Sequence, residues 1–254
     1  MNNFIAQSAI SKEILKIATL SSSLPVNCII IGPKAVGKSH LAKVVAPNAK
    51  SYNSLELQKA IKSKTIDLNI IDEIIILDIQ KLSSIKQIIE MLEEKNIKIV
   101  ATATTFKESY KDSFQAQIEV PPLSQRLEDV EFLKETYIQE AKRVFLIDEE
   151  ISADIELDLT NNAISLKKSI FKSILFDSLT KNDIINILEK FLYKELEQHS
   201  SYKELLPIFE IPLLKAGKKR YKSQLQMAKH FDINRNTLRK KMIENQIDEQ
   251  FNTK

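Results

Sequence analysis

The segment 32–39 constrains the fold of this 254-residue chain more than any other segment. It reads Gly-Pro-Lys-Ala-Val-Gly-Lys-Ser and fits the pattern G-x-x-x-x-G-K-[ST]. The aliphatic run Val26–Ile31 before it predicts a buried strand, and Lys38–Val45 after it predicts a helix. A strand, a tight loop and a helix in this order are typical of an α/β fold with a parallel sheet.

The residue types of this segment also predict its ligand. The whole chain has three glycines, and Gly32 and Gly37 both fall here. Glycine allows a loop to wrap a phosphate with its backbone N–H groups pointing inward, and the following helix adds the positive end of its dipole. Lys38 is then expected to contact the β- and γ-phosphates, and the Ser39 hydroxyl to ligate Mg²⁺. The expected ligand is ATP or another nucleoside triphosphate, bound by Gly32, Pro33, Lys34, Ala35, Val36, Gly37, Lys38 and Ser39.

A second acidic position is expected to complete the Mg²⁺ shell. The aliphatic run Ile74–Leu77 ends in Asp78, and the next residue is Ile79 rather than the glutamate that usually polarises the attacking water. In an alternative register Asp72 follows a shorter run, and Glu73 would supply the catalytic carboxylate. We prefer Asp78, because the alternative would leave four aliphatic residues in a loop.

Short aliphatic runs alternate with helical patterns as far as the pair Pro121-Pro122, and only helical spacing follows. Ser83–Glu94 predicts an amphipathic helix and Ile97–Ala101 a third strand, which favours a parallel sheet covered on both faces. Beyond the prolines, Leu123–Val144 and Ile164–Leu192 predict a small helical domain. The expected domains are therefore an α/β P-loop core over 1–120, a helical lid over 121–196 and an all-α domain over 197–254.

The last part of the chain is strongly basic. Ten lysines and arginines but only one acid, Asp232, lie between Lys215 and Lys241. Because guanidinium groups recognise phosphates and guanine edges in a way that lysine does not, arginines here favour a nucleic-acid surface over a solvated tail. Three of the five arginines of the chain lie in this block, namely Arg220, Arg235 and Arg239.

Residues 223–242 have the pattern of a helix-turn-helix. Leu225 and Ala228 are expected to face inward on the first helix, and His230–Ile233 to form the turn. Asn234 is expected to cap the second helix, which would bury Leu238 and Met242 at i, i+4 spacing. The exposed side of that helix is expected to contact base edges through Arg235, Asn236, Thr237 and Arg239, and phosphates through Lys240 and Lys241.

Together these features resemble a known family. The stretch Asn234–Met242 is similar to the Fis-type helix-turn-helix, and Ile211–Leu214 resembles the preceding helix, through which that group dimerises. The phosphate loop, the stretch Val120–Val130 and the order of domains resemble the AAA+ activators of sigma-54 RNA polymerase, the bacterial enhancer-binding proteins. The resemblance implies an AAA+ core, a lid, a homodimer formed through the C-terminal domain and a higher oligomer formed through the AAA+ domain.

The chain departs from this family at sites that activation requires. Active members carry a Gly-Ala-Phe-Thr-Gly-Ala loop that engages sigma-54, yet this chain has no glycine between Gly37 and Gly217. Its only arginine near the expected arginine fingers is Arg126. The family's finger and sensor positions fall on Lys111, Gln117, Thr104 and Ser165.

We therefore predict a DNA-binding transcription regulator that binds ATP and Mg²⁺, hydrolyses ATP weakly or not at all, and does not activate sigma-54 directly. Removal of an arginine finger costs roughly 10³–10⁵ in rate. The alternative is an active AAA+ ATPase that remodels a nucleoprotein complex in transcription or replication control. Double-stranded DNA is the expected partner, and the sequence leaves contact with RNA polymerase, the operator and the input signal undecided.

The sequence also bears on the compartment. The single cysteine, Cys28, excludes an intrachain disulfide, and no apolar run has the length of a membrane helix. The first eleven residues lack the basic-then-apolar order of a signal peptide. We expect a cytoplasmic protein without a membrane partner.

Overall fold

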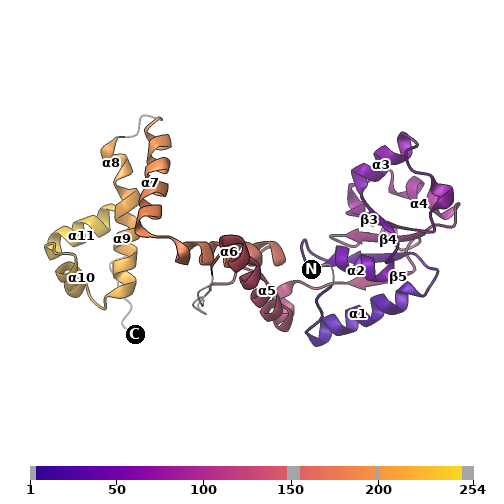
Figure 1. Cartoon of the computed structure of the whole chain (residues 1–254), viewed down its shortest axis with the longest axis horizontal. Coiled ribbons are helices and arrows are strands. Elements are labelled where there is room, and N and C mark those ends of the chain that lie inside the picture. The colour runs from indigo at the N-terminus through magenta and orange to yellow at the C-terminus, as the bar shows by residue number, and fades with distance from the viewer. Residues whose placement is uncertain (1–3, 148–154, 198–200, 248–254) are drawn as a thin grey trace. The chain divides into compact units, whose positions relative to one another are not determined.

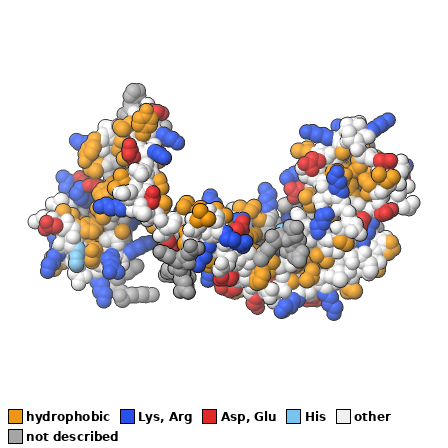
Figure 2. Space-filling model, in the orientation of Figure 1, with side chains coloured by type: hydrophobic (Ala, Val, Ile, Leu, Met, Phe, Trp, Pro, Cys, Tyr) orange, Lys and Arg blue, Asp and Glu red, His pale blue; other side chains and the backbone are white. Residues whose placement is uncertain are grey.

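The computed structural model describes residues 4–147, 155–197 and 201–247, which divide into two compact units, Met1–Ser178 and Leu179–Lys254. Figure 1 draws both units, and Figure 2 shows side chains of both charges on the surface of each. The boundary differs from the one expected between lid and DNA-binding domain, because the helix Lys181–Leu196 falls in the C-terminal unit.

A five-stranded sheet forms the centre of the N-terminal unit. Its strands lie in the order β2-β3-β4-β1-β5, and every neighbouring pair is parallel. The runs predicted as strands around Ile29, Ile75 and Val100 are therefore confirmed as β1, β3 and β4. The strands are β1 Cys28–Ile31, β2 Lys50–Asn53, β3 Glu73–Leu77, β4 Lys98–Ala103 and β5 Ala116–Glu119.

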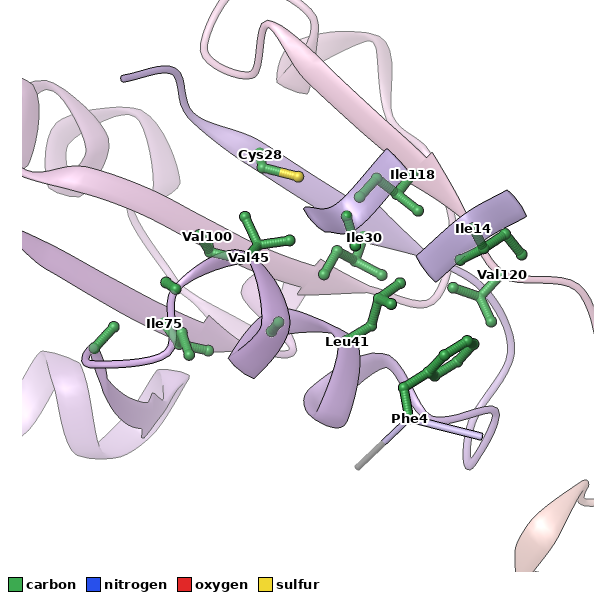
Figure 3. Packing of buried hydrophobic residues seen from close by; sticks show 14 of the residues in the cluster. Phe4, Ile14, Cys28, Ile30, Leu41, Val45, Ile75, Val100, Ile118 and Val120 are labelled. Atoms are coloured by element: carbon green, nitrogen blue, oxygen red, sulfur yellow. The ribbon is translucent and has the colours of Figure 1, made fainter. Parts of the chain in front are cut away.

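Helices cover both faces of the sheet (Figure 1). Strand residues alternate between the two layers: Cys28 and Ile30 pack with α1 and α2, whereas Ile29 and Ile31 pack with α3 and α4. Figure 3 shows the first layer, where Ile30 lies among side chains of the neighbouring helices and strands. The four helices are α1 Ala9–Ser22, α2 Lys38–Val45, α3 Ser54–Lys62 and α4 Ile85–Glu93.

Two helices complete the N-terminal unit, α5 Leu127–Phe145 and α6 Ala163–Ser178. They pack on each other through a third apolar cluster. Leu133 and Ala141 supply the α5 side of that cluster, and Leu166, Ile170 and Ile174 supply the α6 side. The helical spacing read beyond Pro122 is thus confirmed for this pair.

The C-terminal unit is entirely helical in its described residues, and its core lies between the last three helices. Leu214, Met227, Leu238 and Met242 are buried there. Met227 takes the inward position expected of Leu225, whose side chain is 67% exposed, so that prediction is wrong. The helices are α7 Lys181–Leu196, α8 Tyr202–Leu205, α9 Pro207–Arg220, α10 Gln224–His230 and α11 Arg235–Glu244.

Gly217 lies inside α9, where a larger residue would force neighbouring side chains to shift. A Cβ built there would lie 2.6 Å from Cζ of Phe231 and 2.7 Å from Cε of Met227. Real Cβ atoms essentially never approach other atoms so closely, so the third glycine of the chain lets α10 pack against α9.

None of the described helices is both long and apolar enough to span a membrane.

Candidate functional site

The phosphate loop joins β1 to α2 in the backbone shape that its glycines permit. A Cβ on Gly32 would lie 2.2 Å from the carbonyl oxygen of Val120, so only glycine allows this approach. Gly37 has φ 99° and Ala35 has φ 58°, two left-handed residues within one short loop. Alternation of this kind turns backbone N–H groups toward one point and makes an anion-binding hollow.

Lys38 begins α2 and is buried. Its ammonium donates to the carbonyl oxygens of Gly32 at 2.8 Å and Pro33 at 2.5 Å, so the side chain lies back along the loop. Burial lowers the pKa of Lys38, and the nearby carboxylate of Asp78 opposes that effect. The loop thus holds a cation ready to meet a stronger acceptor than a carbonyl.

Asp78 follows β3 directly and has a left-handed backbone, with φ 56° and ψ 53°. Two buried side chains hold it there. The Ser54 hydroxyl donates to the carbonyl oxygens of Leu77 at 3.0 Å and Asp78 at 2.8 Å. The Thr102 hydroxyl oxygen accepts from the Asp78 N–H at 3.0 Å. The carboxylate itself accepts from Lys81 at 2.6 Å.

Glu73 lies at the opposite end of the same strand. It begins β3, and Asp72 precedes it, whereas the phosphate loop follows the carboxyl end of β1, which runs parallel to β3 in the same sheet with β4 between them. Both acids line a separate hollow of about 690 Å³. Ligands of open parallel sheets bind at the carboxyl ends of the strands, so the geometry favours the register that uses Asp78.

The loop, Lys38, Ser39 and Asp78 line one cavity of about 1060 Å³, which α5 and α6 also border. Its lining contains three acids, and each is next to a cation of the same chain. Asp78 pairs with Lys81, Asp129 with Arg126 and Glu140 with Lys167. Among the described residues, no group of three or more His, Cys, Asp and Glu side chains could hold a metal ion.

Arg126 lies beneath the phosphate loop and is 2% exposed. It donates to the carbonyl oxygen of Val36 at 3.0 Å and pairs with Asp129. Burial lowers the pKa of Arg126, and Asp129 opposes that effect. Since the side chain is enclosed within its own chain, it does not project from the surface as an arginine finger would.

Asn162 links the start of α6 to the loop, a role that no sequence pattern indicated. Its amide nitrogen donates to the carbonyl oxygen of Lys34 at 3.0 Å, and its amide oxygen accepts from the Leu123 N–H at 2.8 Å. The next N–H along the chain, that of Ala163, donates to the carbonyl oxygen of Ala35 at 3.3 Å. The loop is therefore held from the lid side by backbone and side-chain bonds.

The other positions that the resemblance implied lie away from the cavity. Thr104 is not in its lining, and the polar residue of β4 that borders it is Thr102. Ser165 is buried and donates to the carbonyl oxygen of Asp158 at 2.9 Å. Lys111 is exposed and pairs with Glu108.

The candidate DNA-contact residues lie on α11. The Asn234 side chain accepts from the Asn236 N–H at 2.8 Å and caps the helix, as predicted, while Leu238 and Met242 are buried. The exposed residues at the start of the helix are Arg235, Asn236, Thr237 and Arg239. Arg235 also donates from Nε to Gln224 Oε1 of α10 at 3.3 Å.

The two lysines expected at phosphates both have acidic neighbours. Lys240 lies 3.8 Å from Glu244. Lys241 pairs with Glu210 of α9, which also accepts from the side chain of Asn245 at 3.3 Å. The hydrogen bond from Lys241 is the main reason that the pKa of Glu210 is lowered. The structure thus places Lys241 at the contact between α9 and α11.

Comparison with known proteins adds evidence on the fold. No protein-family model matches the chain, and no curated protein matches it in sequence. The crystal structure of NtrX from Brucella abortus in complex with ADP covers 97% of this chain and 70% of its own, with a TM-score of 0.57 and 13% identity. The complex of the same protein with ATP covers 96% of this chain and 69% of its own, with a TM-score of 0.52 and 14% identity. The chain has the P-loop α/β fold.

A parallel α/β fold with a phosphate loop was predicted from that loop and from the alternating strands and helices.

Proposed function

We propose that this chain is a DNA-binding transcription regulator whose N-terminal unit binds ATP with Mg²⁺. One observation carries the proposal: the phosphate loop, Lys38 and Asp78 border a single cavity in a chain that also ends in a helix-turn-helix. The crystal structures of NtrX in complex with ATP and with ADP support a nucleotide ligand for a chain of this fold.

The residues of the cavity fit a triphosphate. The Lys38 ammonium would exchange two carbonyl partners for phosphate oxygens, while the first turn of α2, which has no side-chain cap, would direct N–H groups at them. The Ser39 hydroxyl and the Asp78 carboxylate would hold Mg²⁺, which supplies positive charge beside the phosphates.

We further propose that hydrolysis is weak or absent. Ile79 occupies the position after Asp78 and is buried, so it offers no carboxylate to a water molecule. The acids that line the cavity are each paired with a cation. Arg126 is enclosed in its own chain and cannot reach a neighbouring copy. These features support a module in which ATP sets conformation or assembly.

The C-terminal unit would read double-stranded DNA as a homodimer. The exposed start of α11 offers guanidinium, amide and hydroxyl groups of the kinds that pair with base edges. No residue of α7 is buried, although Ile184, Ile187 and Phe191 repeat at helical spacing on it. On α9, Phe209 is 58% and Leu213 is 41% exposed. A second copy would cover these apolar side chains.

An active AAA+ ATPase that remodels a nucleoprotein complex is the second candidate. The observation that favours it is the complete phosphate loop together with an Asp78 held in place by Ser54 and Thr102. An ATPase that turns over would use the same residues both to bind and to hydrolyse ATP. The sigma-54 contact and the RNA polymerase contact are not part of either proposal.

Two measurements separate the regulator from the remodelling ATPase: calorimetry with ATP and Mg²⁺ measures nucleotide binding, and an assay of phosphate release measures hydrolysis. We expect the chain to bind ATP, Lys38→Ala to lose that binding, and Lys12→Ala, an exposed control on α1, to keep it. If the chain hydrolyses ATP at the roughly 1–10³ s⁻¹ of ordinary enzymes, and Lys38→Ala abolishes this turnover, the remodelling ATPase is established instead. Absence of ATP binding would refute both.

DNA recognition needs a separate experiment. Selection of bound duplexes from a random pool should yield a palindromic consensus, and Arg235→Ala should bind consensus and random duplexes more equally than the wild type does. A chain that enriches no sequence would contradict the regulator.

A further inference from the structure

A row of cations lies at the end of α9, outside the recognition helix. Lys215 and Lys219 are spaced at i, i+4 on α9, Arg220 ends the helix, and Lys222 lies two residues beyond it. All four side chains are exposed. Figure 2 shows lysine and arginine side chains gathered over the part of this unit where α9 and α10 lie. We name these four residues the α9 basic stripe.

The stripe differs from α11 in its surroundings. None of its four side chains makes an ion pair with any part of the chain that the structure describes. On α11, by contrast, Lys240 lies near Glu244, and Lys241 is held by Glu210. Lys240 and Lys241 are thus already near acids of their own chain, whereas the four cations of the stripe pair with none among the described residues.

Folding alone does not explain the stripe. Cations in the last turn of a helix gain about 0.3–1 kcal/mol from its dipole, which applies to Lys219 and Arg220. Lys215 lies more than a turn from the helix end, and Lys222 lies beyond it. Like charges at i, i+4, as in Lys215 and Lys219, cost a few tenths of a kcal/mol. A cluster that gives the fold so little is better explained by an anionic partner.

Contacts with α10 place the stripe beside the helix-turn-helix. Tyr221 ends α9, and its ring stacks on that of His230 at the end of α10, with centroids 4.6 Å apart and planes at 13°. Lys229 precedes that histidine and is exposed too. The first helix of a helix-turn-helix crosses the DNA backbone, so the end of α9 lies next to the helix that would approach phosphates.

We propose that the α9 basic stripe binds the phosphates of duplex DNA and supplies the sequence-independent part of the affinity. Lys241, which the sequence placed in that role, instead positions α11 on α9. This inference rests on the proposed DNA-binding function, and it assigns the phosphate contacts to a different helix from the one that reads bases.

Salt dependence of binding tests the stripe directly. The full chain carrying Lys215→Gln, Lys219→Gln and Lys222→Gln is titrated with a selected duplex and a random duplex over a range of salt concentrations. Each phosphate contact contributes about 0.9 to the slope of log affinity against log salt, so the slope should fall by about 2–3. The ratio of the two affinities should stay as in the wild type, because base contacts are untouched.

Two matched triple variants serve as controls. Lys12→Gln, Lys16→Gln and Lys172→Gln remove three exposed lysines from the N-terminal unit and should leave the slope unchanged. Replacement of Lys215, Lys219 and Lys222 by arginine keeps the charges and should keep the slope, which separates charge from a folding defect.

The contrary outcomes are distinct. An unchanged slope in the glutamine variant overturns the proposal and leaves DNA binding intact. If the glutamine variant loses binding to phosphatidylserine vesicles but binds DNA as the wild type does, the stripe binds a lipid surface and the proposal is also overturned. A wild-type chain that binds neither duplex refutes the DNA-binding function together with the stripe.

Discussion

Arg126 and Asp129 form an ion pair beneath the phosphate loop, with Nη1 3.3 Å from Oδ2 and neither side chain more than 2% exposed. Asp129 also accepts from the N–H groups of Gln7 at 2.7 Å and Ser8 at 2.8 Å. Arg126 in turn donates to the carbonyl oxygen of Val36. One buried pair therefore joins the start of α1, the loop and the start of α5.

Asp129→Asn should destabilise the N-terminal unit. The substitution leaves the Arg126 guanidinium buried without a counter-charge, and breaking a buried pair in this way costs about 3–5 kcal/mol. Urea unfolding measures the loss. Glu128→Gln, an exposed neighbour on the same helix, should change the free energy of unfolding by less than about 0.5 kcal/mol. Equal effects of the two substitutions would contradict the role given to the pair.

Thr102→Val should weaken ATP binding only when Mg²⁺ is present. Valine matches threonine in shape but leaves the N–H of Asp78 without its acceptor, at a cost of about 1–3 kcal/mol. ATP affinity is measured with Mg²⁺ and again with a chelator. Thr104→Val, outside the cavity, is the control. A loss of the same size under both conditions would show that Thr102 does not act through Asp78.

Gly217→Ala should destabilise the C-terminal unit even though alanine favours helix by about 1 kcal/mol. The new methyl group would press on Phe231 and Met227, and overpacking of a core costs about 1–3 kcal/mol. The net loss in thermal or urea unfolding should be about 1 kcal/mol. Ala216→Gly, at the exposed neighbouring position, measures the effect of helix propensity alone. A gain in stability for Gly217→Ala would contradict the prediction and show that α9 and α10 can separate slightly at no cost.

The ion pair between Glu210 and Lys241 should make the C-terminal unit sensitive to acid. Because the hydrogen bond from Lys241 lowers the pKa of Glu210, its contribution to stability is complete above the ordinary glutamate pKa of about 4.3. That contribution is lost as the pH falls through the lowered value. NMR titration of the Glu210 carboxyl should show its pKa rising in Lys241→Gln. Glu210→Gln should flatten the acid dependence of unfolding, and Glu189→Gln should not.

The sequence predicted the strands whose residues are mostly apolar. Strands β1, β3 and β4 are buried on both faces and read as aliphatic runs. The two edge strands gave no such pattern, because β2 is Lys-Ser-Tyr-Asn and buries no residue fully, and β5 buries only Ile118. Edge strands contact the sheet on one side only, so polar residues are tolerated there.

The parts of the candidate site formed by residues adjacent in sequence could be predicted. The phosphate loop is eight consecutive residues, and Asp78 ends an aliphatic strand. Thr102, Arg126 and Asn162 act through partners 24, 90 and 128 residues away, and single-sequence patterns do not report contacts at that separation. The same reason explains Lys241, whose partner Glu210 lies 31 residues earlier.

Asn162 couples the phosphate loop to the helix α6. One amide group holds Lys34 and Leu123 together, and the adjacent N–H of Ala163 holds Ala35. A loop that changes shape around a ligand must either break these bonds or carry the first turn of α6 with it. Since α6 runs for sixteen residues to Ser178, where the N-terminal unit ends, a change in the shape of the loop would be carried along that helix to the boundary of the unit.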